Sequence, residues 1–320
     1  MKQRSIHIFF LFINTLVIAQ ITPEEKGFVA HQIIEANDTI NFYIKYPKNS
    51  IPSDLFIHIE GSYAGPLWIE TDPCCVSLDP FNHDLIPENY AYLIFSKQGF
   101  KFSGKPNEIP KNYWKKQTLD FRVNRVDAII KYVKTHIFNP KNLVVIGTSQ
   151  GSDVVAKLGT INNDITHIGF WGSGGHNQLA DFIIKSRKNV YRGKITEEQS
   201  KIIIDSLLNL FHEFYKNPSP DKFWDDNSYL SYVSFSKPPL ESLLKIDIPI
   251  FVAIGTKDEN VPIESSYAIP LEFWRKGKDN LTFKHYPHYD HNFISINDDG
   301  SETDHIDEVT AEFFEWVKKH

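Results

Sequence analysis

The stretch Leu143-Val144-Val145-Ile146-Gly147-Thr148-Ser149-Gln150-Gly151 places one serine between an apolar run and a segment with helical spacing. The run predicts a buried strand, and the small and apolar residues over 152–158 predict a helix. Glycines two residues before and two after Ser149 permit a tight turn in which strand and helix approach closely. The sequence therefore predicts a serine hydroxyl that stands clear above the end of a strand, where it is placed to act as a nucleophile.

Strand and helix patterns alternate along the chain, which indicates an α/β fold with a mostly parallel sheet of eight strands. Two alternating segments separated by turn residues predict an N-terminal antiparallel hairpin, with strands at 28–34 and 39–46. Short apolar runs predict the remaining strands at 55–59, 90–95, 143–146, 165–170, 250–254 and 281–286. Amphipathic patterns predict flanking helices over 118–135 and 304–318.

The segment 172–245, which precedes the seventh strand, is longer than a single crossover helix requires, so we interpret it as an insertion into a domain spanning 28–320. Thr196-Glu197-Glu198-Gln199 fits a capping box and predicts the start of an amphipathic helix. The insertion is either a packed decoration of the sheet or a lid over the serine. Its aromatic residues are candidates for a pocket wall: Phe223, Trp224, Tyr229, Tyr232 and Phe235.

The first 19 residues have the pattern of a signal peptide, with Lys2 and Arg4, an apolar stretch over 6–18, and small residues before Gln20. The apolar stretch is shorter than the roughly 20 residues of a spanning helix, which argues against a permanent anchor. We therefore expect a periplasmic or secreted protein that meets the membrane only during export. A formal charge of −6 without a dense Lys/Arg run argues against a nucleic-acid partner.

The two cysteines of the chain, Cys74 and Cys75, are adjacent. A bridge between neighbours would be strained relative to ordinary disulfide geometry, so no disulfide framework is implied. The sequence also lacks a second thiol pair at the spacing of a zinc site, and we predict no metal.

A serine nucleophile needs a base within hydrogen-bond reach and an acceptor behind that base. Two predicted strands end in loops that carry such groups. Gly255-Thr256-Lys257-Asp258-Glu259-Asn260-Val261-Pro262 follows the strand at 250–254, and Pro287-His288-Tyr289-Asp290-His291-Asn292-Phe293 follows the strand at 281–286. Because both loops emerge at the carboxyl ends of strands in an open parallel sheet, we expect them to meet near Ser149.

With nucleophile, acid and histidine in this order, the chain resembles the α/β-hydrolase family over roughly residue 28 to the C-terminus. The resemblance implies a catalytic triad of Ser149, Asp258 and His291. Two neighbours in the same loops, Glu259 and His288, are the alternatives for the acid and the base.

The resemblance also implies an oxyanion hole, with one backbone N–H from Gln150, the residue after the nucleophile. The stretch His58-Ile59-Glu60-Gly61-Ser62 is similar to the family's His-Gly loop, but Glu60 stands in place of the histidine, and Ser62 N–H is the expected second donor. Glu60 is either a structural anchor of this loop or a contact for a cationic or hydroxylated substrate group. The candidate substrate contacts are Glu60, Tyr63, Trp171 and Trp224.

The function implied by the resemblance is that of an exported serine hydrolase that cleaves a carboxylic ester and needs neither a metal nor an organic cofactor. A polar ester of small or medium size is favoured over a lipid, because the insertion is rich in charged residues. A serine peptidase, either prolyl-peptidase-like or an aminopeptidase, is the catalytic alternative. Its pocket would bind a free amino terminus through a carboxylate, and the candidates are Glu60, Glu213, Asp225 and Asp226. The alternative of another class is a non-catalytic binding protein on the same scaffold.

Overall fold

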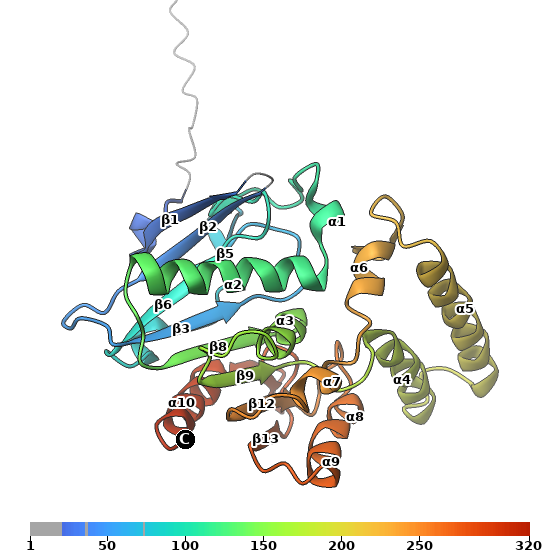
Figure 1. Cartoon of the computed structure of the whole chain (residues 1–320). Helices are drawn as coiled ribbons and strands as arrows, with labels where there is room; N and C mark the ends of the chain where they lie inside the picture. The colour runs from blue at the N-terminus through green and yellow to red at the C-terminus, as the bar shows by residue number, and fades with distance from the viewer. Residues whose placement is uncertain (1–20, 36–37, 73) are drawn as a thin grey trace, which may run out of the picture.

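The computed structural model describes residues 21–35, 38–72 and 74–320, so the predicted signal peptide lies outside the described residues. An eight-stranded sheet crosses the molecule in the order β1-β2-β6-β3-β8-β9-β12-β13 (Figure 1). These strands are β1 (Val29–Glu35), β2 (Asp38–Lys45), β3 (Asp54–Ile59), β6 (Tyr90–Phe95), β8 (Leu143–Thr148), β9 (His167–Trp171), β12 (Ile250–Gly255) and β13 (Leu281–Tyr286). Strands β1, β2 and β6 pair antiparallel, and all other neighbours pair parallel. The predicted mostly parallel sheet with an N-terminal hairpin is confirmed.

Helices cover both faces of the sheet because successive strand residues alternate between two apolar layers. Leu55, Ile57 and Ile59 of β3 pack in the layer formed by α2 (Leu119–His136), α3 (Gln150–Leu158) and α9 (Ala268–Arg275). Phe56, between them, packs in the opposite layer with α10 (Ile306–Val317). The Thr118 hydroxyl accepts the Phe121 N–H and caps α2, one residue from the predicted helix start.

Several short elements connect these layers. A three-stranded sheet contains β4 (Trp68–Glu70), β5 (Cys75–Ser77) and β7 (Ser103–Gly104), and a hairpin joins β14 (Ile294–Ile296) to β15 (Glu302–Asp304). The other short elements are η1 (Glu24–Lys26), η2 (His83–Leu85), α1 (Tyr113–Lys116) and α8 (Ile263–Ser266). Cys74 and Cys75 are free thiols with their sulfur atoms 3.1 Å apart, and Cys74 is exposed. Among the helices of the described ranges, none is long and apolar enough to span a bilayer.

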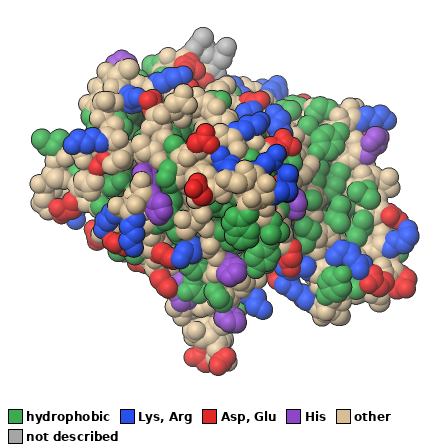
Figure 2. All heavy atoms as spheres, turned by 60° about the horizontal axis from the view of Figure 1, so that its bottom comes forward, with side chains coloured by type: hydrophobic (Ala, Val, Ile, Leu, Met, Phe, Trp, Pro, Cys, Tyr) green, Lys and Arg blue, Asp and Glu red, His purple; other side chains and the backbone are tan. Residues whose placement is uncertain are grey.

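The insertion, residues 172–245, contains α4 (Gln178–Tyr191), α5 (Glu197–Lys216), β10 (Phe223–Trp224), β11 (Asn227–Ser228), α6 (Tyr229–Ser234) and α7 (Pro239–Leu243). Its helices α4, α5 and α6 stand beside the sheet, at the right of Figure 1. They enclose a small apolar core of their own around Phe211, Phe214 and Tyr232. The predicted capping box at Thr196 and Gln199 is present at the start of α5. Apolar side chains also gather on the outer surface of this part of the molecule (Figure 2).

Candidate active site

Ser149 occupies the sharp turn between β8 and α3 predicted from the sequence. Its backbone has φ 53° and ψ −129°, a conformation that non-glycine residues rarely adopt. The flanking glycines are required by close packing, because a Cβ at Gly147 would lie 2.2 Å from the Gly151 carbonyl oxygen. A Cβ at Gly151 would lie 2.1 Å from the Ile59 carbonyl oxygen of β3. The strained turn is held in place by the Ser149 N–H, which donates to the Trp171 carbonyl of β9 at 2.8 Å.

His291 and Asp258 form a hydrogen-bonded pair in the loops after β13 and β12. The distance from His291 Nδ1 to Asp258 Oδ2 is 2.7 Å, and Asp258 is only 2% exposed. The second carboxylate oxygen accepts the backbone N–H groups of Asn260 and Val261 at 2.8 and 2.7 Å. Because the ionised carboxylate only accepts, it fixes the proton of His291 on Nδ1 and leaves Nε2 free to act as an acceptor.

Ser149 and His291 line the same cavity, which has a volume of about 530 Å³. Gly172 lies directly against the imidazole, since a Cβ there would come within 3.3 Å of His291 Cε1. The alternative residues lie elsewhere: His288 is exposed, and Glu259 forms a surface ion pair with Arg192. The structure therefore brings Ser149, Asp258 and His291 together. The alternatives Glu259 and His288 lie outside this group.

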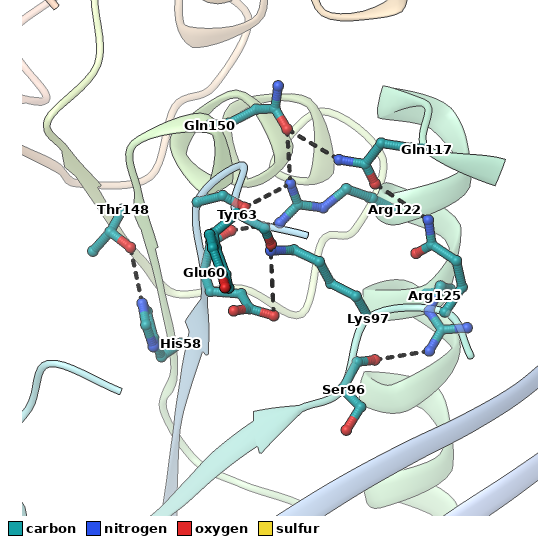
Figure 3. Close-up of polar contacts among 12 residues, drawn as sticks. His58, Glu60, Tyr63, Ser96, Lys97, Gln117, Arg122, Arg125, Thr148 and Gln150 are labelled. Atoms are coloured by element: carbon teal, nitrogen blue, oxygen red, sulfur yellow. Dashed lines mark hydrogen bonds and ion pairs between the residues drawn. The ribbon is translucent and has the colours of Figure 1, made fainter. Parts of the chain in front are cut away.

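The loop after β3, Glu60-Gly61-Ser62-Tyr63, hereafter the 60–63 loop, runs alongside Ser149. A Cβ on Gly61 would lie 3.0 Å from the Ser149 Cβ. Beneath the loop, the buried guanidinium of Arg122 donates to the carbonyl oxygens of Glu60 and Gly61 and to the side-chain oxygen of Gln150 (Figure 3). One arginine of α2 therefore holds both the loop and the first residue of α3.

This bonding also orients the peptide between Gly61 and Ser62. The peptide bond is trans and planar, so its C=O and N–H point in opposite directions. With the Gly61 carbonyl turned toward Arg122 at 3.2 Å, the Ser62 N–H points away from the guanidinium, and Ser62 lines the cavity. Gln150 is the first residue of α3, where backbone N–H groups have no acceptor within the helix.

The Glu60 side chain is buried under the rest of the 60–63 loop and does not line the cavity. Only 5% of the surface of Glu60 is exposed, and its carboxylate lies 3.5 Å from the Lys97 ammonium. The Lys97 ammonium also donates to the Tyr63 carbonyl (Figure 3). Burial raises the pKa of Glu60 and lowers that of Lys97, while the attraction between the two groups opposes both shifts. Of the two interpretations of Glu60, the structure agrees with the structural anchor.

The buried His58 is a further polar residue of β3. Its Nε2 lies 3.0 Å from the Thr148 hydroxyl, and burial lowers the pKa of His58 to about 4. The neutral imidazole therefore links the end of β3 to the residue before the nucleophile (Figure 3).

The other candidate contacts divide into two groups. Tyr63 and the fully buried Trp171 line the cavity, as does Tyr232 of α6. Trp224 instead packs against aromatic rings of the insertion core and does not line the cavity, because its indole fills the space beside Phe182 and Phe214. Of the acids considered for an amino terminus, Asp225 and Asp226 line the cavity, and Glu213 lies on α5 beside Lys216.

The insertion contributes a polar wall to the cavity that sequence reasoning missed in part. The insertion wall consists of Gln178, Asp181, Phe182 and Lys185 from one face of α4, Asp225, Asp226 and Asn227 from the β10–β11 hairpin, and Tyr232. The spacing of the α4 residues places them on one helix face. The sequence signal for these residues is a polar stripe on an amphipathic helix. Such a stripe is found on faces exposed to solvent as well as on cavity walls, so it did not identify this wall.

Comparisons with known proteins agree with this architecture. A family model described as the dienelactone hydrolase family matches residues 226–320. The search among curated proteins found no match. Among solved structures, Est1E from Butyrivibrio proteoclasticus with ferulic acid bound is 19% identical, with a TM-score of 0.58 over 91% of this chain and 100% of that chain.

Two further structures are similar at the level of the fold. An esterase from Pyrococcus furiosus is 17% identical, with a TM-score of 0.51 over 85% of this chain and 88% of that chain. An acylaminoacyl peptidase from Pyrococcus horikoshii is 12% identical, with a TM-score of 0.58 over 91% of this chain and 41% of that chain. The sheet order, the strained serine turn and these likenesses together show that the chain has the α/β-hydrolase fold.

Proposed function

We propose that this chain is a serine hydrolase that cleaves a carboxylic ester through an acyl-enzyme intermediate. The observation that carries the proposal is the placement of Ser149, at a strained turn, in one cavity with a histidine already paired to a buried carboxylate. A serine hydroxyl alone is a poor nucleophile, and this arrangement supplies both the base and the group that orients it.

In the proposed reaction His291 Nε2 removes the Ser149 proton as Oγ bonds to the ester carbonyl carbon. The resulting imidazolium is stabilised by Asp258, whose carboxylate lies 2.7 Å from Nδ1. Collapse of the tetrahedral intermediate breaks the bond to the alcohol, which takes the proton from His291. Water then attacks the acyl-enzyme by the same route, releases the acid and restores the Ser149 hydroxyl.

The negative charge of each tetrahedral intermediate requires preorganised donors. We assign these to the backbone N–H groups of Gln150 and Ser62. The first lies at the N-terminus of α3, where the helix dipole also favours an anion. The second is oriented by the bond from Arg122 to the Gly61 carbonyl.

The test is labelling of the folded protein, lacking residues 1–19, with a fluorophosphonate probe that reacts with activated serines. We expect the wild type to be labelled and Ser149→Ala not to be, with heat-denatured wild type as the control for nonspecific reaction. Failure of well-folded wild type to react would reject the proposal and favour a non-catalytic binding role. Full ester turnover by Ser149→Ala would reject the assigned nucleophile.

A peptidase is the second candidate, favoured by the exposed carboxylates of Asp225 and Asp226 in the cavity wall. One of the similar folds is that of an acylaminoacyl peptidase. A panel of p-nitrophenyl esters and aminoacyl amides on the same samples separates the candidates. Amide turnover that depends on these two carboxylates, while ester turnover does not, would promote the peptidase.

Export is a further part of the proposal, based on the signal-peptide pattern of residues 1–19. Expression of the full chain in a bacterial host with N-terminal sequencing of the exported protein tests it. We expect the mature chain to begin at Gln20, and retention of Met1 in the exported fraction would contradict cleavage.

A further inference from the structure

The insertion wall contains side-chain oxygens that make no hydrogen bond of normal geometry. Three of its oxygens are buried without a partner in the structure: Gln178 Oε1, Asp181 Oδ1 and Asn227 Oδ1. Buried acceptors in folded proteins are nearly always satisfied, and each unsatisfied one costs about 1–3 kcal/mol. These three side chains line one wall of the cavity that holds Ser149, so a ligand bound there is a source of donors for them.

Asp181 is the most informative member of this set. An amide side chain can be turned to offer a donor instead of an acceptor, but an ionised carboxylate can only accept. Asp181 is 7% exposed, and burial raises its pKa to about 7, against the opposing effects of the Ser265 hydroxyl and Lys185. Burial therefore disfavours the ionised carboxylate, and a positive group bound beside it would favour ionisation.

The charges around the cavity favour a cation over a neutral donor. Asp225 and Asp226 add two exposed carboxylates to the same wall, and Lys185 is the one basic side chain of the described residues that lines it. The Lys185 ammonium lies over the Phe182 ring, 5.3 Å from the ring centre. Within this wall, acidic groups outnumber basic ones, so the potential facing a substrate is negative.

We propose that the insertion wall is a subsite for a protonated primary amine of the substrate, with Asp181 as its counter-ion. This inference rests on the proposed function and narrows the substrate to an ester or amide that carries an ammonium group. A primary ammonium offers N–H donors, which the unpartnered oxygens of this wall can accept. Asp225 and Asp226 attract the cation toward the cavity, and the buried Asp181 binds it.

The experiment compares hexylammonium and hexan-1-ol as competitive inhibitors of p-nitrophenyl acetate hydrolysis at constant ionic strength. These probes share an apolar chain and differ in the charged group. In the wild type we expect the ammonium to bind about tenfold to a hundredfold more tightly, the range of a charge-assisted hydrogen bond. Equal inhibition, or stronger inhibition by the alcohol, would overturn the inference without the use of any variant.

Asp181→Asn tests the residue itself, because it removes the charge and preserves the shape. We expect the preference for hexylammonium over hexan-1-ol to fall to near unity in this variant. Asp205→Asn is the matched control, since Asp205 lies on the solvent-facing side of α5 in an ion pair with Lys201, and its preference should equal that of the wild type. An unchanged preference in Asp181→Asn would overturn the assignment. Asp225→Asn, at an exposed turn, provides a milder variant in which a smaller loss is expected.

The two proposals fail in distinguishable ways. Absence of both fluorophosphonate labelling and ester turnover would reject the hydrolase. Calorimetric titration of Ser149→Ala with the same two probes would then still measure the ammonium preference. Normal labelling and turnover with no preference for the ammonium would reject the subsite alone.

Discussion

The groups that hold the serine turn and His291 make more hydrogen bonds than those of the insertion wall, although the Glu60 carboxylate and the Trp171 indole N–H also lack hydrogen-bond partners. On the sheet side, Arg122 bonds to three oxygens around the 60–63 loop and α3, and Asp258 accepts from His291 and two backbone N–H groups. On the insertion side, Gln178 Oε1, Asp181 Oδ1 and Asn227 Oδ1 have no hydrogen-bond partner. The first arrangement is that of a preorganised reaction centre, and the second is that of a binding surface completed by its ligand.

The two sides also differ in the size of their apolar cores. The strands that position Ser149, Asp258 and His291 share the two large apolar layers of the sheet. The insertion has a separate core of four buried residues, Leu179, Phe211, Phe214 and Tyr232. A unit with so few buried residues opens locally at a lower free energy than the sheet does. The comparison therefore predicts that changes on the sheet side reduce the chemical step, whereas changes in the insertion alter binding.

The largest expected effect is on the sheet side, from Asp258→Asn. The amide keeps the shape of the carboxylate, but it can no longer fix the tautomer of His291, and we expect kcat to fall about 10⁴-fold. Glu259→Gln is the matched control, because this neighbouring acid forms a surface ion pair with Arg192 and should retain turnover within a few-fold. Steady-state kinetics on one ester decides the matter, and equal losses in both variants would contradict the assignment of the acid.

The second largest effect is expected from Phe214→Ala in the core of the insertion. Phe214 is fully buried, and its truncation should lower the free energy of local unfolding by about 3–5 kcal/mol. Hydrogen exchange of amides in α4, α5 and α6 measures this loss, and KM for the ester should rise. Fluorophosphonate labelling of Ser149 should continue. Phe313→Ala, equally buried in the layer around α10, is the contrasting variant that should lower the thermal stability of the whole protein.

A smaller effect on kcat is expected from Arg122→Met. Loss of the guanidinium frees the Gly61 carbonyl, and the Ser62 N–H then loses its fixed direction. Removal of one oxyanion donor reduces kcat about 10²- to 10³-fold in other hydrolases, and KM should change little because the loss falls on the transition state.

Arg125→Met is the control for Arg122→Met, because Arg125 is also buried on α2 but bonds to Asp38 and the Ser96 carbonyl. It should lower thermal stability without the selective loss of kcat. If both variants lost stability and kcat in parallel, Arg122 would be a structural residue only. Partial recovery of kcat in Arg122→Lys would support a positioning role, since lysine supplies charge but not the forked geometry.

The sequence predicted the strands, and it predicted which loops meet at the proposed catalytic residues, because local signals coincide there. Ser149, Asp258 and His291 each follow an apolar run that ends in turn residues, and parallel strands bring their carboxyl ends to one edge. Arg122 and Lys97 were missed because their partners lie in the 60–63 loop, far away along the chain. A signal existed for Arg122, which shares the helix face of Val126 and is therefore directed into the protein.

In the insertion, the helices could be predicted from the sequence, but the residues that line the cavity could not. Its helices follow from the capping box at Thr196 and from apolar periodicity, both local properties. Which face of α4 lines the cavity depends on how α4 packs against α5 and α8, and no short-range pattern reports that packing. For this reason Trp224 was expected at the cavity and lies in the insertion core, whereas Asp181 was not considered at all.

The smallest expected effect comes from removing the same kind of helix cap on each side. Thr196→Ala removes the side-chain acceptor at the start of α5, and Thr118→Ala removes the one at the start of α2. Each should cost about 1 kcal/mol. Because the insertion has its own core, Thr196→Ala should speed hydrogen exchange in α5 while the amides of β8 and β12 stay protected. Thr118→Ala should instead lower the thermal stability of the sheet side. Equal loss of protection in both regions after Thr196→Ala would show that they unfold as one unit, and the insertion could then not adapt to a substrate independently of the reaction centre.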